Sequence, residues 1–155
     1  MHHGKIYLTR YGQSRFGKLG DTTIDTMVQD AGLEGLDDLD RTLVDHVAIA
    51  GMLTPLLNDQ TLLAGLVAMD EAYRAKSIKG VGNACDSGGL AVLDCVAQIL
   101  SGQAHVALAV GLEKMHPLEG KLDSKKIGIA LGTAAHHDDV CHPYTFPHAF
   151  AVIMH

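Results

Sequence analysis

The sequence predicts an α/β fold in which helices cover both faces of a mainly parallel sheet. Short apolar segments that are typical of strands alternate with longer segments whose apolar residues recur at helical spacing. The strand segments are nearly continuous in Val, Ala and Leu, which indicates burial on both faces. Strands and helices that alternate in this way are joined by right-handed crossovers.

The expected elements follow one another along the chain. Residues 5–9 suit a first strand, and either Thr22 or Thr23 can cap a helix that runs to about Ala31. The remaining elements are a strand at 45–50 closed by Gly51, a helix at 62–74, a strand at 75–81, a helix at 90–100 and a strand at 105–110 that ends at Gly111. After about Met115 the pattern changes to a mixed segment with one apolar run at 127–135, which is typical of an excursion from the core.

Composition limits the classes of function. The 155 residues, 47% of them hydrophobic, suffice for one domain with a sizeable core. The net charge of −6 indicates neither a nucleic-acid partner nor an anionic membrane. Three cysteines without the spacing of a disulfide scaffold, and no long apolar run, predict a soluble cytoplasmic chain. The apolar stretch 149–154 stops at His155 without an end signal, so we expect the chain to be cut or covered there.

The most informative residue is Cys85, in the run Val81-Gly-Asn-Ala-Cys-Asp-Ser-Gly-Gly89. A thiol between a strand and a helix would lie at a helix N-terminus, where unpaired N–H groups and the helix dipole favour the thiolate. Ligands of parallel sheets bind at the carboxyl ends of strands, which is where this cysteine falls. Cys85 is therefore a candidate nucleophile.

The residues around Cys85 resemble those of the thiolase family, and most closely the sterol-carrier-protein type. The run Asn83-Ala-Cys-Asp-Ser-Gly-Gly89, and the later Val106-Ala-Leu-Ala-Val-Gly-Leu-Glu-Lys-Met115, are similar to the thiolase nucleophile segment and the strand that follows it. Arg15-Phe-Gly-Lys18 and Tyr144-Thr-Phe-Pro-His-Ala-Phe150 are similar to the N-terminus and to a loop-domain helix. The resemblance implies a thiolase-like layered fold, with 1–115 as the first core half and 116–155 as the start of an inserted loop domain, apparently truncated.

The resemblance also implies an activity, that of an acyl-CoA acyltransferase of the acetyl-CoA C-acetyltransferase type. The nucleophile, Cys85 by similarity, would form a covalent acyl-cysteine with a coenzyme A thioester as substrate and no bound cofactor. Thiolases pair as dimers, and their remaining catalytic histidines and second cysteine lie in a second half whose motifs this sequence does not contain. We therefore expect a homo-oligomer or association with a C-terminal half, and no turnover by these 155 residues alone. The alternative is a non-catalytic thiolase-like fragment or subunit that acts as a binding or assembly module.

Substrate contacts are predicted at Gly88 and Gly89, which can allow close approach of an acyl group, or can instead serve tight packing of the helix. His148 lies where a loop-domain residue would line an acyl pocket, or where it would belong to that domain's core. Asp86 stands where thiolases usually carry a small neutral residue. Its carboxylate would either oppose thiolate formation at Cys85 or cap the helix and point away.

Other cysteines and lysines have plainer interpretations. Cys95 falls on the apolar stripe of its helix and is expected in the core. Cys141, in His136-His-Asp-Asp-Val-Cys-His142, is among ligand types that suit zinc, but the spacing fits no closed site, and no metal is expected. A disulfide from Cys85 to Cys95 or Cys141 would indicate a redox sensor. The run with Lys114, Lys121, Lys125 and Lys126 would either attract coenzyme A phosphates or be a solvated surface.

Overall fold

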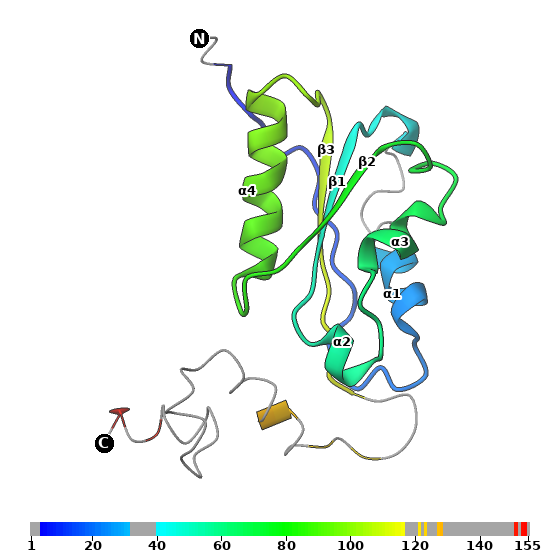
Figure 1. Cartoon of the computed structure of the whole chain (residues 1–155), viewed down its shortest axis with the longest axis vertical. Coiled ribbons are helices and arrows are strands. Elements are labelled where there is room, and N and C mark those ends of the chain that lie inside the picture. Colours follow the sequence, from blue (N-terminus) through cyan, green and yellow to red (C-terminus); the bar gives the residue numbers. More distant parts are fainter. Residues whose placement is uncertain are drawn as a thin grey trace.

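The computed structural model describes residues 4–31, 40–116, 121, 123, 127–128, 151 and 153–154. Most of this part of the chain forms a layered α/β unit (Figure 1). Its elements are α1 (Ile24–Ala31), the 3-10 helix η1 (Arg41–Leu43), β1 (His46–Ala50), α2 (Thr54–Leu57), α3 (Leu63–Ala68), β2 (Ser77–Val81), α4 (Ser87–Leu100) and β3 (Ala107–Gly111).

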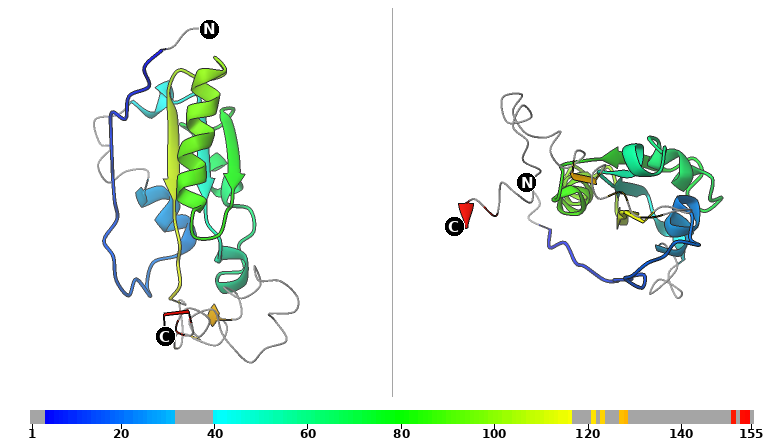
Figure 2. Two further views of the ribbon diagram at one scale, coloured as in Figure 1. Left: turned by 90° about the vertical axis from the view of Figure 1, so that its left-hand side faces the viewer. Right: turned by 90° about the horizontal axis from the view of Figure 1, so that it is seen from below.

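The three strands form one parallel sheet in the order β2-β1-β3. His46, the first residue of β1, is level with Ser77 of β2 and Ala107 of β3, and Ala50 is level with Val81 and Gly111. Helix α4 covers one face of the sheet, while α1 and α3 lie on the other face (Figures 1 and 2). The predicted fold class, a parallel sheet between two helical layers, is confirmed.

The central strand β1 builds both halves of the core because side chains alternate between the faces of a strand. Val47 and Ile49 are fully buried in the cluster that includes residues of α1 and α3. Ala48 and Ala50 belong to the cluster under α4, together with Ala91 and Cys95 of that helix. Alanines on this face allow the helix to pack closely, and this brings the start of α4 to the ends of the strands.

Burial of the two outer strands differs from the prediction. All five residues of β1 are buried, as their apolar composition predicts. In contrast, β2 has no buried residue and β3 has one, Val110. In the described part of the chain these strands are the edges of the sheet, with no strand paired on their outer sides, and apolar composition alone could not distinguish an edge from the centre.

Several predicted boundaries also shift. Thr23 caps α1 as expected, because its Oγ1 accepts a hydrogen bond of 3.2 Å from the backbone N–H of Thr26. The strand predicted at 5–9 is wrong, since residues 4–23 form no helix or strand and run beside the sheet without joining it (Figure 2). The helix predicted at 62–74 is shorter, because Asp70 accepts a hydrogen bond from Ala72 N–H and starts a new turn after α3.

Candidate active site

Cys85 lies in the connection between β2 and α4, at the carboxyl end of the sheet, as the sequence predicts. Strand β2 ends at Val81 and α4 begins at Ser87, three residues earlier than expected. The cysteine is an exposed free thiol. It is therefore open to a reagent or substrate that approaches the carboxyl edge of the sheet.

A tight turn presents this thiol. The Asp86 backbone N–H donates to the Asn83 carbonyl at 3.0 Å, and the Ser87 N–H donates to the Ala84 carbonyl at 3.2 Å. Ala84 has a left-handed backbone conformation, with φ of 47°. For a residue with a Cβ this conformation costs about 1–2 kcal/mol, so the surrounding contacts must hold it in place.

The side chain of Ser87 supplies two of those contacts. Its Oγ accepts a hydrogen bond from the Asn83 N–H at 2.9 Å and donates one to the Ala84 carbonyl at 2.7 Å. Ser87 is only 6% exposed. Sequence analysis missed this role, although a serine at the first helical position, within hydrogen-bonding reach of the preceding turn, is a recognisable signal.

The two glycines that follow have different surroundings. A Cβ on Gly89 would collide with the Asp86 carboxylate, whose Cγ would be 3.1 Å away. A Cβ on Gly88 would meet no atom of the described residues within 4 Å. Gly89 thus makes room for Asp86, whereas the space beside Gly88 is open. Asp86 occupies the N-cap position of α4, but its side chain makes no capping hydrogen bond, so the capping alternative for Asp86 is wrong.

The carboxyl ends of all three strands lie beside this turn. Glycines there allow the neighbouring segments to approach closely. Gly51 follows β1, and a Cβ there would lie 3.0 Å from the Leu112 carbonyl oxygen. A Cβ on Gly111, the last residue of β3, would lie 3.8 Å from the Cα of Gly88. The start of α4 therefore rests directly on the end of β3.

Glu113, just after β3, ties the loop that follows β1 to this edge. Its carboxylate accepts hydrogen bonds from the backbone N–H groups of Met52 at 2.9 Å and Leu53 at 3.0 Å. Sequence analysis did not single out Glu113, because a glutamate after a strand gives no sign of which distant amides it will meet.

Of the four lysines in the predicted patch, the structure describes Lys114 and Lys121. Lys114 is 4% exposed, and its Nζ donates a hydrogen bond of 2.8 Å to the Leu19 carbonyl in the N-terminal segment. Burial lowers the pKa of this ammonium group, while Asp21 acts in the opposite direction. Lys121 is exposed, and Lys125 and Lys126 lie outside the described residues. The interpretation of Lys114 as a solvated surface residue is therefore wrong, and a phosphate contact stays a prediction.

Of the other residues singled out in the sequence, some are described by the structure and some are not. Cys95 is buried under β1 as expected, and burial raises the pKa of its thiol. Cys85 and Cys95 are free thiols in this structure. His148 and Cys141 lie outside the described residues. Within the part that is described, no three His, Cys, Asp or Glu side chains are grouped so as to hold a metal ion.

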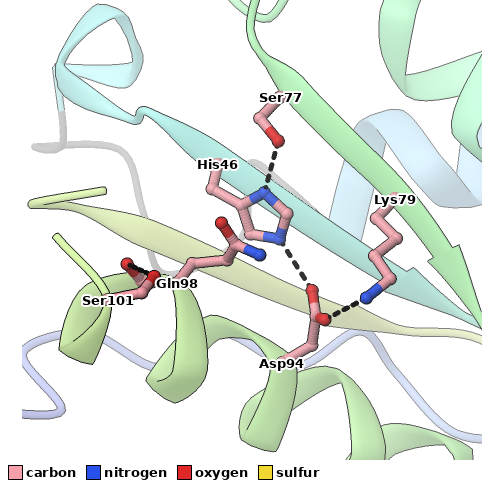
Figure 3. A network of polar contacts seen from close by, with 6 residues as sticks. All are labelled: His46, Ser77, Lys79, Asp94, Gln98 and Ser101. Carbon is pink, nitrogen blue, oxygen red and sulfur yellow. Dashed lines mark hydrogen bonds and ion pairs between the residues drawn. The ribbon is translucent and has the colours of Figure 1, made fainter. Parts of the chain in front are cut away.

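A second polar cluster, which sequence analysis missed, lies at the amino ends of the strands (Figure 3). His46, 1% exposed, is 2.8 Å from Ser77 Oγ through Nδ1 and 2.9 Å from Asp94 Oδ2 through Nε2. Lys79 pairs with the other oxygen of Asp94. The only sign of this cluster in the sequence is a histidine at the start of an otherwise apolar buried strand.

The described residues thus form a parallel α/β core with an exposed cysteine at a strand-to-helix junction, at the carboxyl edge of the sheet. The model of a known family, described as thiolase, N-terminal domain, matches residues 3–152. The chain belongs to the thiolase family, which confirms the resemblance of the sequence motifs.

Curated relatives are similar to this chain over most of its length. An acetyl-CoA acetyltransferase of Methanocaldococcus jannaschii is 30% identical over 112 residues, which are 71% of this chain and 29% of the relative. An acetyl-CoA acetyltransferase of Methanothermobacter thermautotrophicus is 30% identical over 105 residues, 66% of this chain and 27% of the relative. The benzoylsuccinyl-CoA thiolase subunit BbsB of Thauera aromatica is 28% identical over 121 residues, 75% and 30% of the two chains.

The matched part of this chain thus spans less than a third of the length of each of these relatives. The names of these relatives do not mention the sterol-carrier-protein type, so the resemblance to that type stays a prediction. The helices in the described part of the chain are too short or too polar to span a bilayer.

Proposed function

We propose that this chain is the nucleophile-bearing part of a thiolase-type acyl-CoA acyltransferase, with Cys85 as the residue that carries the acyl group. The observation that supports the proposal is the exposed Cys85 thiol in a turn between β2 and α4, at the edge of a parallel sheet where ligands bind. The names of two relatives, both acetyl-CoA acetyltransferases, favour an acetyl thioester as the acyl donor.

The proposed step is a transfer between two sulfur atoms. The Cys85 thiolate attacks the carbonyl carbon of the acyl-CoA, a new C–S bond forms, and the bond from that carbon to the coenzyme A sulfur breaks. Coenzyme A leaves as a thiolate and takes up the proton that Cys85 lost. Donors that stabilise the oxyanion contribute strongly to such reactions. By resemblance, the base and the oxyanion hole come from a second thiolase half, so we propose that acyl transfer needs that half.

Intact-mass analysis after incubation with acetyl-CoA tests this proposal. The full product of the gene is compared with the 155-residue chain, and each is compared with its C85A variant. We expect an acetyl adduct in the longer protein that disappears in C85A, and no turnover by the 155 residues. The buried Cys95 gives the control C95A, which should keep the adduct if the variant folds. An adduct that persists in C85A, or its absence from every form, would contradict the proposal.

The alternative function is that of a non-catalytic assembly module. It is favoured by the open edges of the sheet, because neither β2 nor β3 has an outer strand partner in the described part of the chain. Open strand edges pair readily with another strand. We propose that the chain then forms homo-oligomers or binds a separate C-terminal half. Multi-angle light scattering would show an oligomer, whereas a stable monomer would count against this alternative.

A further inference from the structure

We propose that Ser87 is a positioning residue for Cys85: its hydroxyl locks the turn that presents the thiol at the start of α4. The proposal rests on the proposed function, since positioning matters only if Cys85 reacts. It adds a residue whose part in the site comes from its contacts in this structure. The contacts join Ser87 to the two residues directly before the cysteine, Asn83 and Ala84.

The Ser87 hydroxyl group makes two hydrogen bonds, one as acceptor and one as donor. It accepts from Asn83 N–H at 2.9 Å and donates to the Ala84 carbonyl at 2.7 Å, so its single proton is used in the second bond. The same Ala84 carbonyl also receives the Ser87 backbone N–H at 3.2 Å. Ser87 thus holds the turn on both sides of the left-handed Ala84, one residue ahead of Cys85.

Ser87 is the buried residue of this turn. Ser87 is 6% exposed, whereas Cys85, two residues earlier, is exposed. Without the hydroxyl, the Asn83 N–H would lose its acceptor in this part-buried bond, and the left-handed Ala84 would lose a restraint. The turn would then open, and the thiol would lose its fixed place before the start of α4. The intact turn holds the thiol exposed, and a thiol that packs against the chain after the turn opens reacts more slowly with a reagent.

Four variants of the 155-residue chain separate this role from general stability. S87A removes the hydroxyl. S87T and S87V form a pair of equal shape in which only the threonine keeps a hydroxyl. S101A is the matched control, because Ser101 Oγ also donates to a backbone carbonyl of α4, that of Gln98 at 3.0 Å, but at the far end of the helix (Figure 3). Circular dichroism verifies that each variant keeps its helical content.

Two measurements report on the turn without any acyl-CoA. Hydrogen exchange followed by NMR gives the protection of the Asn83 amide relative to amides in the middle of α4. Peptide mapping after timed exposure to iodoacetamide gives the alkylation rate of Cys85 alone. We expect S87A and S87V to speed exchange at Asn83 by about tenfold, the effect of losing one hydrogen bond. We expect them to slow Cys85 alkylation at pH 7 severalfold, while S87T and S101A stay near the original chain.

The outcomes decide between the two proposals. If acetyl-CoA never acylates Cys85 but the Ser87 variants change its alkylation as described, the positioning role holds and the acyltransferase proposal fails. If alkylation is the same in S87T and S87V, or if S101A has as large an effect as S87A, the positioning role is overturned. It is also overturned if S87A and S87V lose the helical signal while S87T keeps it, because the hydroxyl then supports the whole fold.

Discussion

His46 Nε2 and Asp94 Oδ2 lie 2.9 Å apart and join the central strand to helix α4 inside the sheet-helix layer (Figure 3). Ser77 is hydrogen-bonded to the other ring nitrogen of His46. The order Ser77–His46–Asp94 resembles the Ser-His-Asp triad of a hydrolase. The cluster is at the amino ends of β1 and β2, however, whereas Cys85 follows the carboxyl end of β2. Lys79 of β2 also forms an ion pair with the second oxygen of Asp94, so this cluster links the strands to helix α4 through polar contacts.

Replacing Asp94 tests how much its contacts with His46 and Lys79 stabilise the fold. D94N removes the charge that pairs with Lys79 and disturbs the only hydrogen bond shown for His46 Nε2, so we expect a loss of about 1–2 kcal/mol of unfolding free energy. Urea denaturation followed by circular dichroism measures it. The control D59N removes an exposed aspartate and should change stability by less than about 0.5 kcal/mol. Equal effects of the two substitutions would show that Asp94 has no special role.

Acid is expected to destabilise the fold. The hydrogen bond from Lys79, followed by that from His46, lowers the pKa of Asp94, and the backbone N–H groups of His105 and Val106 lower the pKa of Asp45. A carboxyl group with a lower pKa in the folded state binds fewer protons there than in the unfolded chain. Its stabilising contribution is therefore complete above the unfolded-state pKa and disappears as the pH falls through the folded-state pKa.

Urea midpoints measured from neutral pH into the acid range check this sign. The midpoint should fall as the pH drops below the ordinary aspartate pKa, and the decline should be shallower in D94N, which lacks one of the groups with a lowered pKa. A midpoint that rises with acid would contradict the expected sign, and a decline of unchanged steepness in D94N would exclude Asp94 as a source.

Gly88 and Gly89 should respond differently to alanine. G88A adds a Cβ where the described residues leave space, so better helix propensity should stabilise the chain by about 0.5–1 kcal/mol. G89A pushes aside the carboxylate of Asp86, an exposed and flexible group, so the gain should be smaller or absent. Thermal melts of both variants, repeated in a D86A background, measure the difference. If the difference between G88A and G89A survives in D86A, Asp86 is not its cause.

Glu113 is expected to hold the loop after β1. E113A removes the acceptor of the Met52 and Leu53 N–H groups and should cost about 1–2 kcal/mol, with faster hydrogen exchange at these two amides. E71A is a suitable control, because Glu71 is 88% exposed and lies 3.9 Å from Arg74, a surface pair of little energetic value. Exchange at Met52 and Leu53 that is unchanged in E113A would contradict the assignment.

Patterns of neighbouring residues predicted a large part of this fold. Alternation of apolar strands and helical segments identified the parallel sheet and its two helical layers, and glycines marked the ends of the strand at His46–Ala50 and of the strand at Ala107–Gly111. The predictions failed where a segment depends on a partner. Residues 5–9 have the composition of a strand, but a strand is stable only when another strand pairs with it.

The same distinction applies to the candidate site. Cys85, Gly88 and Gly89 could be named from one short run of sequence because a strand, a turn and a helix follow each other there. Lys114 could not be judged in this way, since its burial depends on the carbonyl of Leu19, 95 residues earlier. A charged residue in a polar stretch gives no local sign that its side chain will be enclosed.

The sequence by itself determined that a cysteine stands between a strand and a helix of an α/β chain with thiolase motifs, because both features are local along the chain. Only the tertiary structure decided which groups hold that cysteine in place and which hold the sheet to its helix. Ser87 closes the turn around Ala84, and Asp94 reaches His46 from 48 positions away. The physical reason is that hydrogen bonds depend on distances of about 3 Å and on direction, which arise only once the strands and helices have packed.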